Sequence, residues 1–381
     1  MIQRDRLVQH LLDLIRIDSP SRKERKVALR LKNDLETMGA NVVFDKAGEK
    51  INGSIGNLVA HFKGSGQKAS PFLLSAHMDT VQPGEGIKPR IDEDTIRTDG
   101  TTVLGGDDKS GIAIVCEAIR SLQEENIPHG DLELVFTICE EDGLQGAKNL
   151  DISLLKSRFG LVFDSDAAGI LFTKAPASDR MEFTVHGLEA HAGMCPERGL
   201  NAIQIASEAI ANMRLGRLDE DTTANIGVIQ GGLAPNIVAK QVFIKAEARS
   251  HSNEKLSAQT KHMRKCLQDA VGRHSVVVDG ITHISRLEEK VWRDYERIDI
   301  QDDSPIVQLV LNAAHNLGQN IETRKMGGGC DASALNQRGF QVANLGTGMH
   351  DIHTVNEWLD IPEMCRTASI VEEILKLHAK G

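Results

Sequence analysis

Apolar segments in this chain repeatedly end in a histidine or a carboxylate. Three of them have the length and composition of buried strands, and they end at His77, Glu140 and Asp164. Helical patterns separate these segments, and strands that alternate with helices predict an α/β fold with a mostly parallel sheet and helices on both faces. In such folds the side chains that follow the carboxyl ends of the strands line a common cleft. The sequence therefore predicts that these three side chains lie close together.

The hydrophobic pattern changes near residue 178, and a chain of 381 residues is too long for one ordinary core. We expect residues 1–177 and 297–381 to form one domain and residues 178–296 to form a second domain inserted into it. The inserted segment predicts strands at 180–186, 223–230 and 242–249, helices at 201–213 and 255–271, and a last strand from Ser275. This β-α-β-β-α-β order is typical of a ferredoxin-like α+β domain.

Composition and charge exclude several classes of protein. The formal net charge is −10 and no Lys/Arg stripe stands out, which argues against nucleic-acid binding. No apolar stretch approaches the roughly 18 residues that span a bilayer, so we expect no membrane association. The six cysteines are scattered without a CxxC pair, which favours reduced thiols. The first residues lead into an amphipathic helix rather than an apolar signal segment, and we expect a cytoplasmic protein.

Histidines and carboxylates follow one another along the chain in an ordered series of potential metal ligands. The series is His77, Asp79, Asp107, Asp108, Glu140, Glu141, Asp164, His353 and Glu357. Taken singly these motifs are weak, because HxD triplets arise by chance and acidic doublets usually belong to solvated surfaces. Their position after apolar strands favours metal ligands over solvated surface residues. An unpaired carboxylate at such a place costs several kcal/mol unless metals or hydrogen-bond donors compensate. Two histidines and several carboxylates can hold two divalent cations, and a spare glutamate can move protons. The series predicts a metal-dependent hydrolase of amide bonds.

Specific motifs extend this interpretation over essentially the whole chain. They are SAHMDT, LGGDDKSG, TICEEDGLQGA, LVFDSD, GLEAHAG and HTVNEW. Together they resemble the two-metal metallopeptidase family that includes peptidase T, bacterial glutamate carboxypeptidase, succinyl-diaminopimelate desuccinylase and aminoacylase. The aspartate ligand in LVFDSD is more similar to the peptidase T-like branch than to the branches with a glutamate there.

The resemblance implies a role for each ligand residue. His77 and Asp164 would bind one metal ion, Glu141 and His353 would bind the other, and Asp107 would bridge them. Two neighbours offer alternatives for single positions. They are Asp166, two residues after Asp164, and His350, three residues before His353. Only His353 begins the HxxNE pattern, and we favour the first-named residue in both cases.

The resemblance also implies the chemistry around the ions. Glu140 would be the general base, and it would take a proton from the attacking water and pass it to the leaving amine. Asp79 would accept the far N–H of His77 and fix its tautomer. The peptide bond between Asp107 and Asp108 would be cis. A mixed nitrogen and oxygen ligand set suits zinc, and cobalt or manganese could replace it.

Further residues resemble groups that contact the substrate in this family. His191, in the lid motif GLEAHAG, would stabilise the oxyanion from across a dimer interface, whereas without the resemblance it reads as a surface loop histidine. Asn236 and Arg249 would hold the substrate carboxylate, although Arg249 could equally be a solvated strand end. Gly328 and Gly329 match the glycine-rich substrate loop and lack the spacing of a nucleotide fingerprint. We expect a homodimer formed through the inserted lid domain.

The activity expected from the resemblance is hydrolysis of short peptides by an aminopeptidase. Two departures bear on specificity: Met326 stands where peptidase T carries an arginine, and Cys330 where relatives often have Ser or Thr. The alternative enzyme is a carboxypeptidase or an N-acyl-amino-acid amidohydrolase with the same metal centre. A more distant alternative is an inactive binding protein of the same fold, which predicts a broken ligand set or a missing base.

Overall fold

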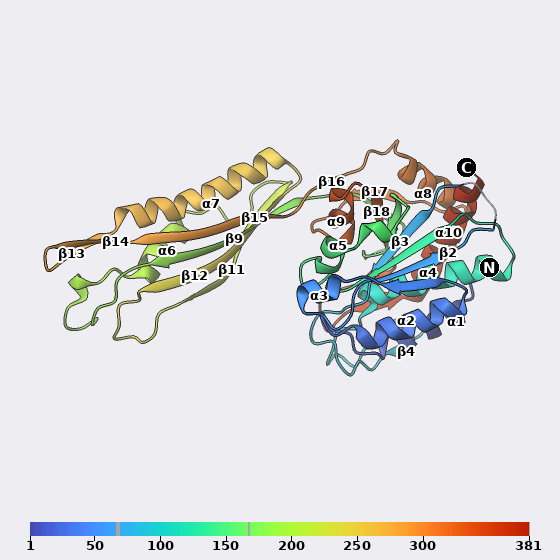
Figure 1. Ribbon diagram of the computed structural model, residues 1–381, viewed down its shortest axis with the longest axis horizontal. Coiled ribbons are helices and arrows are strands. Elements are labelled where there is room, and N and C mark those ends of the chain that lie inside the picture. The colour runs from blue at the N-terminus through green and yellow to red at the C-terminus, as the bar shows by residue number, and fades with distance from the viewer. Residues whose placement is uncertain (66–68, 167, 381) are drawn as a thin grey trace. The chain divides into compact units, whose positions relative to one another are not determined.

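The chain folds into two compact units. In the computed structural model, which describes residues 1–65, 69–166 and 168–380, the first unit comprises Met1–Lys174 with Ile298–Gly381 and the second comprises Ala175–Arg297 (Figure 1). The chain passes from one unit to the other after Lys174 and returns after Arg297. Within the described residues, no helix has both the length and the apolar character needed to cross a membrane.

The first unit is built around a mixed sheet. Among the described residues its strands, in spatial order, are β1 (Asn41–Phe44), β2 (Leu58–Phe62), β6 (Leu132–Thr137), β3 (Phe72–His77), β7 (Phe159–Val162), β18 (Gln341–Leu345), β8 (Ile170–Ala175) and β16 (Ile298–Asp299), and β17 (Glu322–Lys325) pairs with β8. The central strands β6, β3, β7 and β18 run parallel, whereas β1 and β2 join the edge antiparallel. Strands β3 and β6 are buried along their whole length, as is usual for parallel strands that helices cover on both faces.

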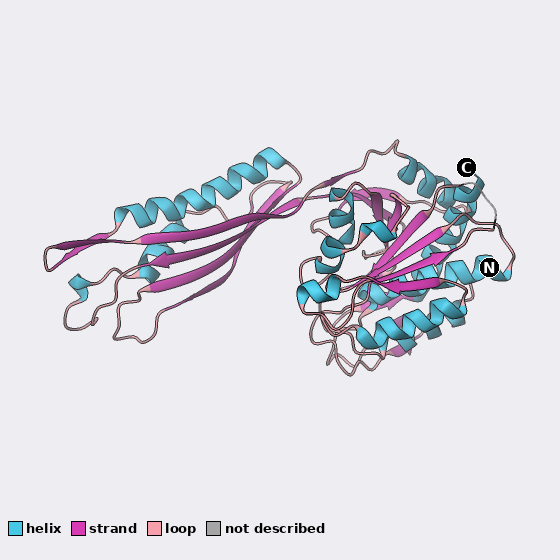
Figure 2. Ribbon diagram, viewed as in Figure 1, coloured by secondary structure: helices cyan, strands magenta, loops and turns pink. Residues whose placement is uncertain are grey.

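Helices cover this sheet on both sides (Figure 2). They are α1 (Arg4–Ile15), α2 (Arg25–Thr37), α3 (Ala47–Ile51), α4 (Gly106–Glu124), α5 (Gln145–Asn149), α8 (Pro305–Asn316), α9 (Asp331–Gln337) and α10 (Ile361–Lys380), with a short 3-10 helix at Ile152–Leu154. Helix α4 packs against β3 and is flanked by α1 and α10, while α9 packs against β18 and α5. A small antiparallel sheet is formed by β19 (Met349–His350), β20 (Trp358–Asp360), β5 (Thr95–Arg97) and β4 (Arg90–Asp92). The predicted α/β class with a mostly parallel sheet is confirmed.

The second unit is an antiparallel sheet with two helices packed on it. Its strands, in spatial order, are β10 (Gly216–Arg217), β11 (Thr222–Gly231), β12 (Gln241–Ser250), β9 (Ala177–His186) and β15 (Arg286–Tyr295), and its helices are α6 (Ala202–Ala211) and α7 (Asn253–Arg273), with a short 3-10 helix at Pro196–Arg198. Apolar side chains of the two helices and of the sheet form one buried core. The order β9-α6-β11-β12-α7-β15 is the ferredoxin-like order.

The last strand of this sheet lies later in the chain than the sequence pattern indicates. Residues that were expected to begin that strand instead form a hairpin of β13 (Ser275–Val278) and β14 (Ile281–Ile284). Asp279 and Gly280 lie between the two strands with φ of 51° and 78°. Two successive positive φ values are typical of the tight turn that Asp-Gly favours, and this turn ends the strand before β15 begins.

Candidate metal centre

The potential ligands of the first unit lie at the ends of neighbouring strands. His77 ends β3, Glu140 and Glu141 follow β6, and Asp164 follows β7. Asp107 lies at the start of α4, at a kink where its backbone is not helical. The parallel pairing of β6, β3 and β7 brings these loops together at one edge of the sheet.

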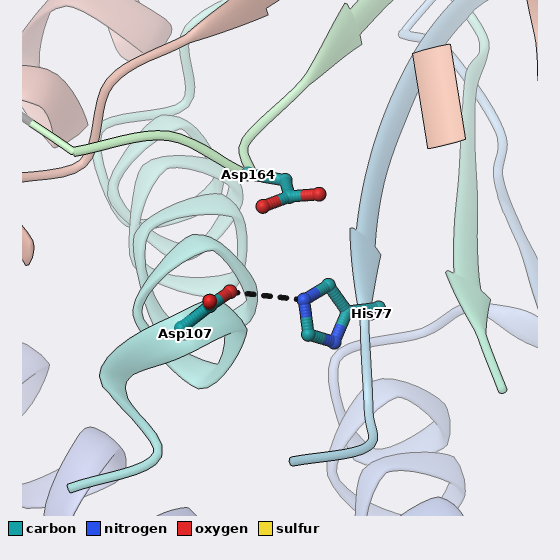
Figure 3. A group of neighbouring side chains, drawn as sticks. All are labelled: His77, Asp107 and Asp164. Carbon is teal, nitrogen blue, oxygen red and sulfur yellow. Dashed lines mark hydrogen bonds and ion pairs between the residues drawn. The ribbon is translucent and has the colours of Figure 1, made fainter. Parts of the chain in front are cut away.

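Asp107 occupies the middle of the cluster. Its Oδ1 lies 3.0 Å from Nε2 of His77, and its Oδ2 lies 3.0 Å from Nε2 of His353. His353 Nε2 also lies 3.0 Å from Oε1 of Glu141. Figure 3 shows Asp107 facing His77, with Asp164 beside them. The carboxylate of Asp107 thus joins two histidines through opposite oxygens, which is the arrangement expected of a bridging ligand.

Within the described residues, three groups place ligand atoms within 4.8 Å of one another. They are His77 with Asp107 and Asp164, His77 with Glu140 and Glu141, and Asp107 with Glu141 and His353. The first and third groups share Asp107, and they contain the same residues as the two ligand sets that the resemblance implies. Asp166 and His350 belong to none of the three groups.

The two alternative ligands have other surroundings. Asp166 is exposed, and its Oδ1 accepts a hydrogen bond from Ser165 Oγ at 3.3 Å. His350 Nε2 lies 3.2 Å from Oε2 of Glu363, and its ring stacks on Trp358 with centroids 4.2 Å apart. The geometry therefore favours Asp164 and His353 as ligands.

The charges of the cluster fit divalent cations. His77, Asp107 and Glu140 are at least nine-tenths buried. Burial, with the nearby charge of Asp107, raises the pKa of Asp164 to about 8. Burial, followed by the charge of Asp164, raises the pKa of Glu140 well above its usual range. Carboxylates brought together out of water repel one another, and bound cations would remove that penalty. The donor set of imidazole nitrogens and carboxylate oxygens is one that zinc, cobalt and manganese accept.

Asp79 contacts the site differently from the role that the sequence indicates. His77 Nδ1 bonds at 2.9 Å to the main-chain carbonyl of Asp79, while the carboxylate is 3.6 Å away. The carboxylate instead accepts main-chain N–H bonds from Glu140 at 3.0 Å and Glu141 at 3.2 Å, and a bond from Ser21 Oγ at 2.6 Å. Nδ1 of His77 therefore still has a hydrogen-bond partner at residue 79, but that partner is the main-chain carbonyl. The Asp79 side chain, however, fixes the loop that carries Glu140 and Glu141.

Asp108 and Glu357 also bind the main chain rather than a potential ion position. Asp108 Oδ2 accepts from the main-chain N–H of His77 at 3.1 Å. Glu357 Oε1 accepts from Asp107 N at 3.0 Å, and its Oε2 accepts from Leu104 N at 2.7 Å and from the next residue at 2.9 Å. The Asp107–Asp108 peptide bond is cis, as the resemblance implied. The sequence places these two carboxylates in the series of potential ligands, the resemblance does not name them as ligands, and in the structure both bind the main chain.

The remaining candidates belong to none of the three groups of ligand atoms described above. Gly328 and Gly329 lie in the loop between β17 and α9. His191 and Asn236 are exposed on loops of the second unit, where the main-chain N–H of Ala192 bonds to the carbonyl of Asn236 at 3.0 Å. Arg249, on β12, is partly buried and pairs through Nε with Glu247 at 3.0 Å.

Comparisons with known proteins show the family of the chain. The family model described as Peptidase family M20/M25/M40 matches residues 73–377. The chain is 39% identical over 381 residues to the uncharacterized protein YqjE of Bacillus subtilis (strain 168), with 100% of both chains covered. It also resembles the crystal structure of aminopeptidase PepT from Bacillus cereus ATCC 10987, with 36% identity, a TM-score of 0.88 and 100% of both chains covered.

A second solved structure gives a similar result. A tripeptidase from Staphylococcus aureus subsp. aureus Mu50 is 37% identical, with a TM-score of 0.92 and 100% of both chains covered. The family model and these full-length similarities identify the kind of enzyme to which the cluster belongs. The chain belongs to the peptidase family M20/M25/M40, of which it is a peptidase T-like member, and it is a metal-dependent peptide hydrolase.

Proposed function

We propose that this enzyme is a two-zinc aminopeptidase that releases N-terminal residues from short peptides. The observation that carries the proposal is the position of Asp107 between Nε2 of His77 and Nε2 of His353, each 3.0 Å away. The full-length similarity to an aminopeptidase and to a tripeptidase supports short peptides as substrates. We prefer zinc because the proposed ligand set contains histidine nitrogens as well as carboxylate oxygens. Cobalt or manganese could replace zinc at such a site.

The proposed division of ligands follows the geometry. His77 and Asp164 would hold one ion, Glu141 and His353 would hold the other, and Asp107 would contribute one oxygen to each. The two groups of neighbouring side chains that share Asp107 support this division. When bound, such ions polarise the scissile carbonyl and lower the pKa of an attacking water.

Glu140 would move the proton during the reaction. Its side chain is buried beside His77 and Glu141. A buried carboxylate beside the proposed ion positions can accept a proton from water and then release it to the leaving amine. Glu140 itself remains free of the ligand role that Glu141 takes in this proposal.

His191 would donate a hydrogen bond to the oxyanion. Its Nδ1 accepts main-chain N–H bonds from Gly193 and Met194, both at 3.2 Å. A neutral imidazole whose Nδ1 accepts must carry its proton on Nε2, so the exposed end of His191 is a hydrogen-bond donor. This is the protonation that oxyanion stabilisation requires.

The second unit would also bind the substrate carboxylate and a second copy of the chain. We propose that Asn236 and Arg249 bind the substrate carboxylate, and that Gly328 and Gly329 of the first unit belong to a substrate loop. The proposed homodimer would form through the second unit, as a lid and dimerisation domain. Met194, Leu233, Val277, Ile281 and Ile284 of that unit are more than 60% exposed, and apolar side chains exposed to this extent favour burial at an interface. The free cysteines are consistent with a cytoplasmic location.

A hydrolysis screen tests the proposal. The apo enzyme is loaded with zinc, cobalt or manganese and given matched dipeptides, tripeptides and N-acetylated tripeptides. We expect cleavage of the first peptide bond of free tripeptides and loss of cleavage after N-acetylation. Preferred cleavage of the N-acetylated substrates, or release of the C-terminal residue, would identify an amidohydrolase or a carboxypeptidase instead.

A further inference from the structure

One polar side chain interrupts the apolar strand β18. Asn344 is fully buried, among Val342, Ala343 and Leu345, which are also buried. A buried amide in such a strand costs free energy unless its donors and acceptor are satisfied. We propose that Asn344 positions Asp164 and thereby sets the affinity of only one of the two ions, the one held by His77 and Asp164. This inference rests on the proposed two-ion function.

Asn344 binds the main chain of Asp164 at both of its polar groups. The main-chain N–H of Asp164 donates to Asn344 Oδ1 at 2.9 Å, and Asn344 Nδ2 donates to the main-chain carbonyl of Asp164. Strand β7 ends at Val162, which is the residue paired with Asn344 in the sheet. The amide side chain therefore extends the contact between the two strands to Asp164, two residues beyond Val162, and fixes the backbone from which the Asp164 carboxylate projects.

The orientation of the amide is determined by its three partners. Nδ2 also lies 3.4 Å from Sγ of Cys330, at the start of α9, so both amide hydrogens have an acceptor. An aspartate in place of Asn344 has the same shape, but it would set a carboxylate oxygen against the carbonyl of Asp164. A carboxamide is required at this position because the N–H of Asp164 needs an acceptor and the carbonyl of Asp164 needs a donor.

The second proposed ion position is held by different contacts. The main-chain N–H of Glu141 bonds to Asp79 Oδ2 at 3.2 Å. Asp107, which both positions share, is held by Glu357 through its main-chain N–H at 3.0 Å. None of these contacts involves Asn344. A change at Asn344 should therefore weaken one ion position and leave the other at its original affinity.

The chain offers a matched control for the amide. Asn336 binds both main-chain groups of Val342 in the same way, through Nδ2 to the carbonyl at 2.7 Å and through Oδ1 from the N–H at 3.4 Å. Its second donor bond goes to the carbonyl of Ala332 at 2.8 Å. Asn336 thus acts on the same strand as Asn344 but on no residue of the metal cluster.

The experiment measures ion affinity by titrating zinc into the apo enzyme and counting sites calorimetrically. The variants are Asn344→Asp and Asn336→Asp, with unfolding curves of each apo form. We expect the wild type to bind two ions. Asn344→Asp should bind one with unchanged affinity and the other about 10–100-fold more weakly, the usual effect of losing a group that orients a ligand. Asn336→Asp should bind both ions as the wild type does.

Two backgrounds identify the ion that is weakened. With His353→Ala the remaining ion would lie at His77 and Asp164, and adding Asn344→Asp should weaken it. With His77→Ala the remaining ion would lie at Glu141 and His353, and adding Asn344→Asp should change nothing. Equal weakening in both backgrounds, or equal weakening of both ions in the single variant, would overturn the inference.

A further variant covers failure to fold. If Asn344→Asp does not fold, Asn344→Ser introduces no charge and cannot span both main-chain groups of Asp164, so the same selective loss is expected. A folded Asn344→Ser variant with both wild-type affinities would overturn the inference. A wild-type enzyme that binds fewer than two ions would instead contradict the proposed function, whatever the variants do.

Discussion

The two units present their candidate residues in opposite ways. In the first unit His77 and Asp107 are buried, and each has its main-chain N–H bonded to a carboxylate from elsewhere in the chain. In the second unit His191 and Asn236 are exposed on loops. A metal site needs ligand side chains whose positions are fixed before the ion binds. Mobile ligands do not keep the coordination geometry, and they bind the ion more weakly. Groups that touch only substrate have no such need. The comparison predicts that changes at the metal cluster of the first unit alter metal content or proton transfer, whereas changes in the second unit alter kcat or KM and leave the metal content unchanged.

The largest effect is expected at Glu140. Glu140→Gln should keep the fold and both ions while lowering kcat by about 10²–10⁴-fold, because a carboxamide cannot accept the proton from water. Steady-state kinetics with metal analysis of the same preparation would measure both quantities. Near-normal turnover in the metal-loaded variant would remove Glu140 from its proposed role.

Glu141→Ala is the matched comparison for Glu140→Gln. The two residues are adjacent, but Glu141 lies 3.0 Å from His353 Nε2 and is the proposed ligand. We expect this variant to lose one ion. If both variants lost metal to the same extent, the assignments of the pair would be wrong.

The next largest effect is expected in the second unit. His191→Ala should lower kcat by about 10²–10³-fold, as loss of one oxyanion donor does, with metal content unchanged. Loss of metal on this change would contradict the separation of roles between the units.

Mixing inactive subunits tests the proposed dimer. If His191 acts on the partner's site, a chain with Glu140→Gln mixed with a chain with His191→Ala should regain activity, because each mixed dimer has one complete site. Sedimentation would check that subunits associate and exchange. Exchange without recovery of activity, or an active monomer, would show that His191 does not act across an interface.

Local pattern predicts the fold class and the segments that carry several of the candidate residues. His77, Glu140 and Asp164 end apolar segments, so the fold class and the meeting of their loops could be predicted from spacing alone. The hairpin at residues 275–284 was missed as a separate element, although its Asp279-Gly280 pair is a strong turn signal.

Contacts between distant segments could not be predicted in this way. Asp79 was expected to bind the ring of His77, two residues away, but its carboxylate binds the main chain of Glu140 and Glu141, about sixty residues on. Nothing in the spacing of an HxD triplet distinguishes these partners. In the sequence, Asn344 is recognisable only as a polar residue within an apolar strand. This pattern does not indicate which residue its side chain binds.

The variant Asp79→Asn tests whether the Asp79 carboxylate acts on the main chain of Glu140 and Glu141 or on the ring of His77. Its effect on ion affinity and kcat is expected to be intermediate among these predictions. An amide would place an N–H₂ group where an acceptor now meets the N–H of Glu140 or Glu141. We expect about 10–100-fold weaker binding of the ion held by Glu141, with lower kcat from the displaced base. Weakening confined to the ion held by His77 would restore the role first indicated by the sequence. Zinc titration in the His77→Ala and His353→Ala backgrounds separates these outcomes.

The smallest effect is expected at Arg249, where the second unit would meet the substrate carboxylate. Arg249→Lys keeps the charge but loses the planar fork that binds a carboxylate through two bonds. We expect KM to rise roughly tenfold, the loss of about one charged hydrogen bond, with kcat and metal content unchanged. Arg180→Lys is the control, because Arg180 pairs with the same Glu247, at 2.8 Å, and has no proposed contact with substrate. C-terminally amidated peptides make the test specific: if Arg249 binds the substrate carboxylate, Arg249→Lys should not raise KM for them further. An equal rise in KM for amidated and free peptides would mean that Arg249 supports β12 through Glu247 and does not bind the substrate carboxylate.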